Sequence, residues 1–389
     1  MVFRIQFRRD MTTGPKSRVP FGMLGLFMPQ NYRLLSNRFL MTAKTNTTAV
    51  TNQIHIMARM LFFAATLRTA NFVIPMPFSA PHTLFSGHNG AIYDAAYWHA
   101  ARKWVTAGGD GVVASWSHAG EGTAELHHNQ AFFSVATVGN QLIAGSASGE
   151  LLIKGSGAPP QRIEAHDGGI FVLAAAAKGA VFSGGGAGQI HHWRHSGGTW
   201  KLRDRFIAPD RSKVRTLLPA PNGWLVGTSA GWLGTLMDRR FNRFVDMPAT
   251  GHYAAVQLPQ REAWLVASGD GHLRVIRFTG EVVYSFPAHQ GPIYRLVVTG
   301  DVIWSASRDK SVKAWRASDL VPVDKLVFKG GGHTRSVNAL AAHRTLDGWE
   351  LVSGGDDRSA RKFELNDWGY RATSPPADDR AARASDSPD

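Results

Sequence analysis

The feature that most constrains this 389-residue chain is a unit of about 40 residues that recurs seven times between residues 82 and 365. Several units open on a Gly-His or Ala-His pair and close on an aromatic residue. The clear copies are residues 85–116, 165–193, 286–315 and 332–363, and the fainter ones are residues 128–154, 206–236 and 251–276. Because a unit of this size cannot bury its own hydrophobic face, neighbouring units must stack to share a core.

The pattern inside each unit predicts short β-strands. An alternating apolar run, as in residues 91–96 and 292–297, leads through a turn to a second run that ends in small residues. A Gly/Asp turn and a third run follow. Four short strands per unit, with a turn pattern that repeats, are typical of a propeller blade rather than a sandwich. We therefore predict an all-β, seven-bladed β-propeller.

Two units carry the same four polar and aromatic residues at the same spacing. Four positions separate the hydroxyl residue from Asp, and six separate Asp from Trp; the residues are His88, Thr106, Asp110 and Trp116 in unit one, and His289, Ser305, Asp309 and Trp315 in unit six. These tetrads resemble those of the WD40-repeat family. The resemblance covers residues 82–365 and implies that the four side chains hydrogen-bond across a blade, so that a buried imidazole and carboxylate are both paired.

The other units depart from this pattern. Units three and seven keep partial tetrads, and these are His166, Ser183 and Trp193 with Ala187 in place of Asp, and His333, Ser353 and Asp357 with Phe363 in place of Trp. Unit five is expected to keep His252 and Asp270, with Val266 and Ile276 at the other two positions. Units two and four lose most of the set, with Ser148 and Lys154 or Ala230 and Leu236 at the last two positions. We expect these blades to depend on apolar packing.

Unit seven shows three strands and then stops near Leu365, which would leave an open sheet edge. The segment His82–Phe85, ahead of unit one, has the length of one strand and no unit of its own. The resemblance implies that this segment becomes the outer strand of the last blade. Both ends of the repeat region would then close one blade.

The ends of the chain differ in composition from the repeats. Residues 1–80 hold ten Lys/Arg and a single acid, which gives +9 of the total charge of +14, and their longest apolar stretch is too short to span a membrane. We expect a poorly ordered basic extension. Three interpretations stay open: a start assigned too early, with the natural chain beginning near Met60 or Met76, a mitochondrial presequence, or a functional basic arm. Residues 370–389 are expected to form a disordered polar tail.

Several kinds of chemistry are disfavoured. The chain has no cysteine, which removes disulfides and thiolate metal sites. His191 and His192 are neighbours on a predicted strand and point to opposite faces, so the cluster with His195 is not expected to bind a metal. The tetrads share their composition with a hydrolase triad, but they recur and end in Trp, which favours scaffolding. We therefore predict no catalytic, cofactor-binding or metal-binding residue.

One set of positions favours a docking surface. The residue after the first buried aliphatic of each unit should lie beside the central channel, and it is aromatic or Arg in most units. Such residues are enriched at binding hot spots. The predicted partner-binding residues are Tyr93, Phe133, Phe171, Arg215, Tyr294 and Asn338. The alternative is that Phe133 and Phe171 only pack between blades.

The function predicted from these features is a non-enzymatic, cytoplasmic scaffold that binds a protein or peptide through the top face of the propeller. A first alternative is an RNA-associated or ribonucleoprotein-associated propeller. It draws on the leader and on basic residues around unit four, which are Arg211, Lys213, Arg215, Arg239, Arg240 and Arg243. A second is a propeller-based enzyme, which would need convergent titratable groups. Mitochondrial localisation would follow from a genuine presequence.

Overall fold

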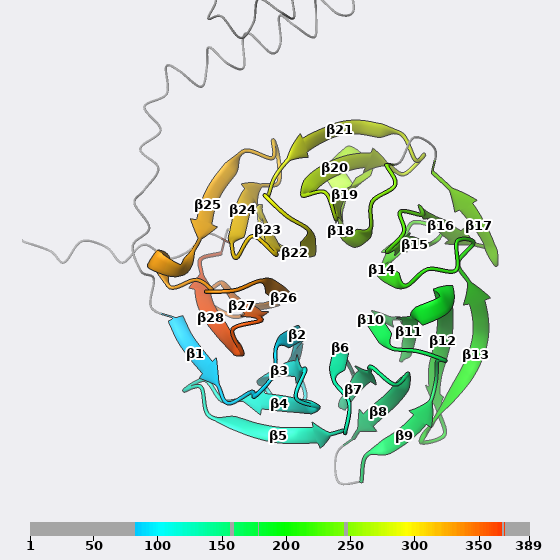
Figure 1. The fold of residues 1–389 in the computed structure, drawn as a ribbon, viewed down its shortest axis with the longest axis vertical. Coiled ribbons are helices and arrows are strands. Elements are labelled where there is room, and N and C mark those ends of the chain that lie inside the picture. The colour runs from blue at the N-terminus through cyan, green and yellow to red at the C-terminus, as the bar shows by residue number, and fades with distance from the viewer. Residues whose placement is uncertain (1–81, 156–158, 178, 245–247, 368, 370–389) are drawn as a thin grey trace, which may run out of the picture. The chain divides into compact units, whose positions relative to one another are not determined.

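A computed structural model describes residues 82–155, 159–177, 179–244, 248–367 and 369 of the chain. These residues form 28 strands, which pair into seven sheets of four strands each. The sheets are arranged as blades around a central axis (Figure 1), which confirms the prediction of an all-β, seven-bladed propeller. The expectations for residues 1–80 and 370–389 lie outside the described residues.

Each blade has an inner strand, two middle strands and an outer strand, and we number the blades from the one that begins with β2 (Figure 1). The inner strands are β2 (Ile92–Trp98), β6 (Phe132–Val138), β10 (Ile170–Ala176), β14 (Val214–Ala220), β18 (His252–Leu258), β22 (Ile293–Thr299) and β26 (Val337–Arg344). The second strands are β3 (Lys103–Gly108), β7 (Gln141–Ser146), β11 (Ala180–Gly185), β15 (Gly223–Thr228), β19 (Ala263–Ser268), β23 (Val302–Ser307) and β27 (Trp349–Gly355).

The remaining strands lie farther from the axis. The third strands are β4 (Val112–Trp116), β8 (Glu150–Lys154), β12 (Gln189–Ser196), β16 (Leu233–Met237), β20 (His272–Arg277), β24 (Val312–Arg316) and β28 (Ser359–Leu365). The outer strands are β5 (Gly122–His127), β9 (Gln161–Glu164), β13 (Thr199–Ile207), β17 (Arg240–Arg243), β21 (Val282–Pro287), β25 (Pro322–Leu326) and β1 (His82–Ser86). Short 3-10 helices in the described residues are η3 (Gly186–Gly188), η4 (Pro259–Arg261) and η5 (Phe328–Gly330).

The ring closes through its two ends. Strand β1 pairs antiparallel with β28, in a register that matches His82 with Phe363 and Ser86 with Ser359. The seventh sheet therefore has the order β1-β28-β27-β26 and combines the two ends of the repeat region. This pairing confirms the predicted outer strand of the last blade and covers the edge that β28 would otherwise expose.

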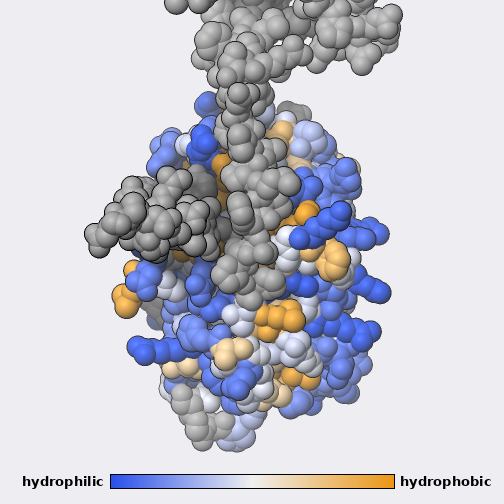
Figure 2. Space-filling model, turned by 90° about the vertical axis from the view of Figure 1, so that its left-hand side faces the viewer, coloured by the Kyte–Doolittle hydropathy of each residue, from blue (hydrophilic) through white to orange (hydrophobic). Residues whose placement is uncertain are grey.

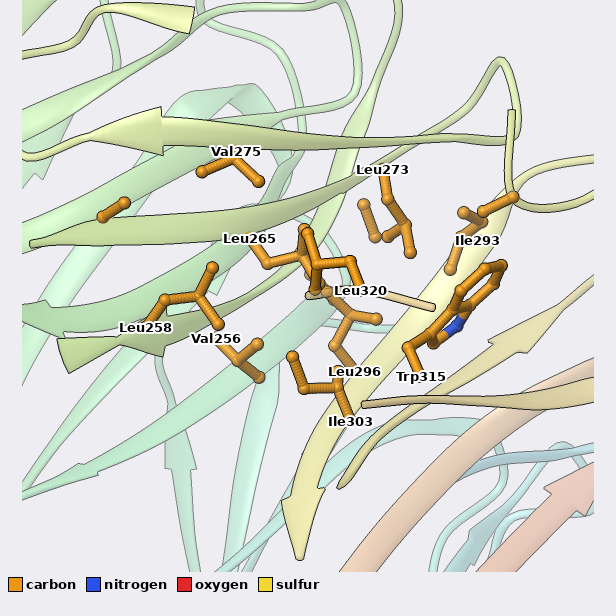
Figure 3. Packing of buried hydrophobic residues seen from close by; sticks show 14 residues of the cluster. Val256, Leu258, Leu265, Leu273, Val275, Ile293, Leu296, Ile303, Trp315 and Leu320 are labelled. Carbon is orange, nitrogen blue, oxygen red and sulfur yellow. The ribbon is translucent and has the colours of Figure 1, made fainter. Parts of the chain in front are cut away.

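The hydrophobic core consists of seven clusters, one at each seam between neighbouring blades. At the seam between blades five and six, Leu265 and Leu273 face Ile293 and Trp315 (Figure 3). Burying one large apolar side chain contributes about 1.5 to 3 kcal/mol. Because each seam draws its residues from two blades, no blade can be removed without exposing two clusters.

Every inner strand contains the same irregularity. In all seven blades the pairing with the second strand shifts between the first and third residues of the inner strand, as at Ile92 and Asp94 in β2. The second residue of each inner strand is thus a bulged position outside the ladder. A bulge re-aims its side chain. In this fold the seven bulged residues ring the central axis.

The side of the propeller that Figure 2 shows is largely hydrophilic among the described residues. Figure 2 views the side on which β1 and β25 lie, and its hydrophobic residues are scattered among hydrophilic ones. Exposed large hydrophobic residues there include Leu84 and Phe328. Isolated residues of this kind are ordinary on a protein surface. Among the described residues, none of the helices has the length and apolar character needed to span a bilayer.

Candidate docking site at the central pocket

Buried tetrads fix the loops that lead into the inner strands. In blade one, His88 Nε2 lies 2.8 Å from Thr106 Oγ1, which also accepts a hydrogen bond from the Trp116 indole at 2.8 Å. His88 Nδ1 lies 2.9 Å from an oxygen of Asp110, and that carboxylate also accepts the N–H of Asn89. Each polar atom that the loop buries is therefore paired.

Blades six and seven repeat this arrangement. His289 contacts Ser305 Oγ at 2.7 Å and Asp309 at 2.9 Å, and the Trp315 indole donates to Ser305 Oγ at 2.9 Å. In blade seven His333 contacts Ser353 Oγ at 2.9 Å and Asp357 at 2.9 Å. Phe363 fills the position of the Trp and is buried, but it offers no N–H donor.

Blade three keeps half of the arrangement and replaces the rest. His166 Nε2 lies 2.7 Å from Ser183 Oγ, to which the Trp193 indole donates at 2.8 Å. Ala187 leaves His166 Nδ1 buried without a hydrogen-bond partner. The Gln189 side chain accepts the N–H of Asp167 at 3.0 Å, which is the role of the Asp110 carboxylate in blade one.

Blades two and four use polar side chains that the sequence pattern did not reveal. In blade two, His128 Nε2 lies 2.7 Å from Glu150, which also pairs with Arg162. In blade four, Asp210 stands where the tetrad His is expected and accepts a hydrogen bond from Thr228 Oγ1 at 2.5 Å. Apolar packing alone therefore does not hold these two blades.

The tetrad prediction for blade five is wrong in its register. His252 is the first residue of β18 and pairs with Ser268, as Ile92 pairs with Gly108 in blade one. It thus lies inside the strand, not in the loop before it, and its Nδ1 lies 3.2 Å from Ser268 Oγ. The carboxylate of Asp270 pairs with Arg274. The Gly251-His252 pair has the sequence of the Gly-His pair that precedes the inner strand in other blades, but here it lies at the start of the strand itself.

The histidines of β12 pack against other aromatic rings. His191 stacks on His166 with ring centroids 4.2 Å apart, whereas His192 stacks on Phe182 at 4.4 Å. The two side chains thus pack on different neighbours. No group of three or more candidate metal ligands occurs in the part of the chain that the structure describes.

The missing Asp in blade three predicts a pH dependence. Burial, and then the neighbouring His191, lowers the pKa of His166 to about 3. The unfolded chain, with a pKa near ~6.5 at this residue, binds a proton below that pH that the folded chain does not. The stabilisation is complete above pH ~6.5 and is lost as the pH falls toward about 3, with a loss of about 2 kcal/mol by pH ~5.

We therefore expect the His166→Gln variant to depend less on pH than the wild type. Between pH ~7.5 and ~5, its free energy of unfolding should fall by about 2 kcal/mol less. Urea denaturation at both pH values measures the difference. Parallel pH profiles for the two proteins would contradict the buried, neutral state of His166.

The bulged residues of six inner strands form a chain of ring contacts around part of the axis. Tyr93 packs edge-on against Phe133 with ring centroids 5.3 Å apart, and Phe133 stacks on Phe171 at 5.2 Å. The Arg215 guanidinium lies 5.2 Å from the Phe171 ring and 5.3 Å from the Tyr253 ring. Tyr253 in turn packs on Tyr294 at 5.6 Å. We call these residues, together with Asn338, the bulge ring.

The structure brings all six predicted partner-binding residues to one pocket. The pocket has a volume of about 390 Å³, and besides those six residues it is lined by Arg295, Arg308, Ser336 and Asp356. Phe133 and Phe171 are half-buried, so they both pack between blades and line the pocket. Tyr253, the ring member of blade five, was missed because His252 was placed in the preceding loop. Alignment of its strand with the other inner strands could have found it.

The pocket combines aromatic faces with positive charge. Burial raises the pKa of the Tyr93 and Tyr294 phenols, so both are protonated donors at neutral pH. Asn338 Nδ2 donates to Asp356 at 2.6 Å, and Ser336 donates to Asn338 Oδ1 at 2.9 Å. Burial, and then the charge of Arg295, lowers the pKa of Arg215. This arrangement suits hydrogen bonding and desolvated contact with a partner.

The basic residues around unit four are not gathered into one surface. Arg215 lies on the inner strand β14, whereas Arg240 and Arg243 lie on the outer strand β17 of the same blade. Arg239 pairs with Asp204 of blade three. These basic residues are thus divided between the pocket, where Lys213 and Arg215 both lie 5.2 Å from the Phe171 ring, and the outer edge of the blade.

The closed ring of seven four-stranded blades and the buried tetrads define the chain as a β-propeller of the repeat type. Solved structures share this fold. The crystal structure of the WD40 beta propeller domain of Doa1 matches with a TM-score of 0.63 and 16% identity, over 75% of this chain and all of that one. A computationally designed protein, Ika8, matches with a TM-score of 0.53 and 18% identity, over 73% of this chain and all of that one.

The family model described as "WD domain, G-beta repeat" matches residues 79–117 and 280–316. These segments end in the two complete tetrads, in blades one and six. Two segments of the chain thus match WD40 repeats, and the chain has the fold of a WD40 β-propeller domain. No curated protein matches its sequence.

Proposed function

We propose that the protein is a non-enzymatic scaffold that docks a protein or peptide segment on the face that carries the bulge ring. WD40 propellers typically serve as interaction scaffolds. The observation that supports this particular face is the pocket, into which the bulges of six inner strands turn aromatic, Arg or Asn side chains. Such side chains bury much area at low entropic cost.

The titratable groups near the pocket support binding rather than catalysis. Asp94 and Arg295 pair with each other, and Asp356 accepts the Asn338 amide. The phenols of Tyr93 and Tyr294 have raised pKa values, which makes them poor general bases. No base or nucleophile stands activated by a neighbour among the residues that line this pocket.

A substitution of Tyr294 tests the docking face. Tyr294→Glu places a carboxylate beside Arg215 and Arg308 and is expected to abolish partner capture, with a melting temperature within about 2 °C of the wild type. The tagged full-length protein is recovered from its native cell, and co-purifying proteins are quantified by mass spectrometry. Tyr284→Glu, on the exposed face of the outer strand β21, is the matched control and is expected to retain the partner.

Equal recovery of the same proteins by wild type and Tyr294→Glu would show that docking occurs elsewhere. Loss of recovery by the Tyr284→Glu control would likewise move the docking site to the rim.

A further inference from the structure

Of the three guanidinium groups that line the pocket, those of Arg215 and Arg308 form no ion pair with the residues that the structure describes, and Arg308 is exposed. Arg295 is paired: its guanidinium lies 3.2 Å from Asp94 Oδ1. Asp94 is itself occupied, because its other oxygen accepts the N–H of Val135 at 3.0 Å. Arg215 forms no ion pair with the residues that the structure describes, and its Nε is buried without a hydrogen-bond partner.

The rings on either side hold the Arg215 side chain in place. The guanidinium lies between Phe171 and Tyr253, at 5.2 and 5.3 Å from the ring centroids. Lys213 lies 5.2 Å from the Phe171 ring and adds positive charge nearby. Cation–π contacts of this kind stabilise a guanidinium but leave its N–H donors unused. A partly desolvated cation without an anion costs free energy, which an incoming oxyanion would relieve.

The acids of the pocket do not supply that anion. Asp356 is half-buried on the wall and accepts the Asn338 amide at 2.6 Å. The single negative charge of Asp356 is outnumbered by the two positive charges of Arg215 and Arg308, and the side chain of Arg308 is exposed. The pocket thus carries an excess of positive charge after Arg295 and Asp94 are paired. A planar fork of donors beside aromatic walls matches a carboxylate on an aliphatic stem.

We infer that the bulge-ring pocket captures the carboxylate of an Asp or Glu side chain in an acidic peptide segment of the partner, with Arg215 as its principal ligand. This inference rests on the proposed docking function and names the chemistry of what docks. The stem of the acidic residue lies against Phe171, which lines the pocket beside Arg215. The pocket volume of about 390 Å³ admits neighbouring side chains of the same segment, which contact Tyr93 and Phe133.

A display library of random peptides tests the inference. The full-length protein is panned in parallel with its Arg215→Gln variant and with Arg203→Gln, which removes the same charge from the exposed outer strand β13. Peptides enriched on wild type and on Arg203→Gln are expected to share an Asp or Glu at one fixed position. They are not enriched on Arg215→Gln.

The synthetic consensus peptide gives the quantitative test. Replacing its fixed acid by the amide should weaken binding to wild type at least about tenfold, and Arg215→Gln should weaken binding of the unaltered peptide by a similar factor. The two changes combined should cost no more than either one, because each removes the same contact. Arg215→Lys keeps the charge without the planar fork and is expected to lose most of the affinity, which covers the case of an unfolded Gln variant.

The outcomes separate this inference from the docking proposal. If Tyr294→Glu abolishes binding of the enriched peptides but Arg215→Gln does not change it, the face docks peptides and the carboxylate assignment fails. If neither substitution changes binding, the docking proposal fails as well. Enrichment of peptides without a fixed acid, no enrichment on wild type, or much tighter binding of a phosphoserine at the fixed position would each overturn the carboxylate assignment.

Discussion

Deletion of residues 76–87 is expected to leave the protein insoluble, whereas deletion of residues 1–75 leaves the propeller folded. The first deletion removes all of β1, and with it the five residue pairs that this strand makes with β28. It also removes Phe85, which is fully buried and stacks on Trp116 with ring centroids 5.2 Å apart. The exposed edge and the uncovered cluster between blades seven and one would then drive aggregation.

A matched pair of substitutions isolates the buried face of β1. Phe85→Asp places a carboxylate in the cluster between blades seven and one and should cost more than about 4 kcal/mol, since it adds an unpaired buried charge to a cavity. Leu84→Asp changes the neighbouring residue, which is 48% exposed, and should be tolerated. Soluble expression and thermal denaturation measure both. Equal solubility of the two truncations, or of these two variants, would reject closure of the ring through β1.

Substitution of His289 by Ala is expected to lower the free energy of unfolding by about 3 kcal/mol. The imidazole lies between Ser305 and Asp309 and is buried together with the Ser305 hydroxyl. Burial lowers the pKa of His289, so the ring is neutral at neutral pH and contacts both partners through its two nitrogens. Its removal leaves the buried Ser305 hydroxyl on β23 and the half-buried Asp309 carboxylate without the partner that they share.

The carboxylate adds a dependence on acid. Burial alone would raise the pKa of Asp309, but the hydrogen bond with His289 and the hydroxyl of Ser311 hold it well below its usual range. That contribution to stability is present above pH ~4 and is lost as the pH falls further. In His289→Ala the unfolding free energy should therefore also vary less with pH in this acid range. Urea denaturation at several pH values measures both effects.

His127→Ala is the control, because His127 is exposed at the end of β5. It should change the free energy of unfolding by no more than about 0.5 kcal/mol. If the two variants were equally stable, the tetrad would contribute nothing beyond its packing.

The repeat period and the tetrad spacing were sufficient to predict the number of blades, the closure by β1 and the residues of the two complete tetrads. These features are local in sequence or follow from the burial that each unit needs. The replacements in the weaker blades were harder to predict. Glu150 and Asp210 take part in networks at positions where the repeat pattern has no acid, so only the folded geometry shows which donors they meet.

The sequence pattern placed His252 wrongly, in the loop before the inner strand of blade five. A Gly-His pair before an apolar run fits both the loop signature and the first residue of a strand, and the two differ by four positions. Because the start of this inner strand was placed four residues too late, Tyr253 was left out of the predicted ring. Six of the seven ring residues were nevertheless predicted from sequence, because they follow a buried residue at the start of each inner strand. That Arg215 lacks an ion pair could not be predicted from sequence, because it follows from the positions of residues on several blades.

In all seven inner strands the bulge separates the residues that hold the blades together from the side chains that surround the central axis. Ladder hydrogen bonds use main-chain atoms, and the seams take their side chains from the positions on either side of the bulge. A new residue at a bulged position therefore alters the face while the main-chain ladder stays in place, although Phe133 and Phe171 also pack between blades. Seven single-codon sites, scattered along the gene but adjacent in space, thus shape one face of the protein, and a designer who wants to redirect it to another target would begin with those.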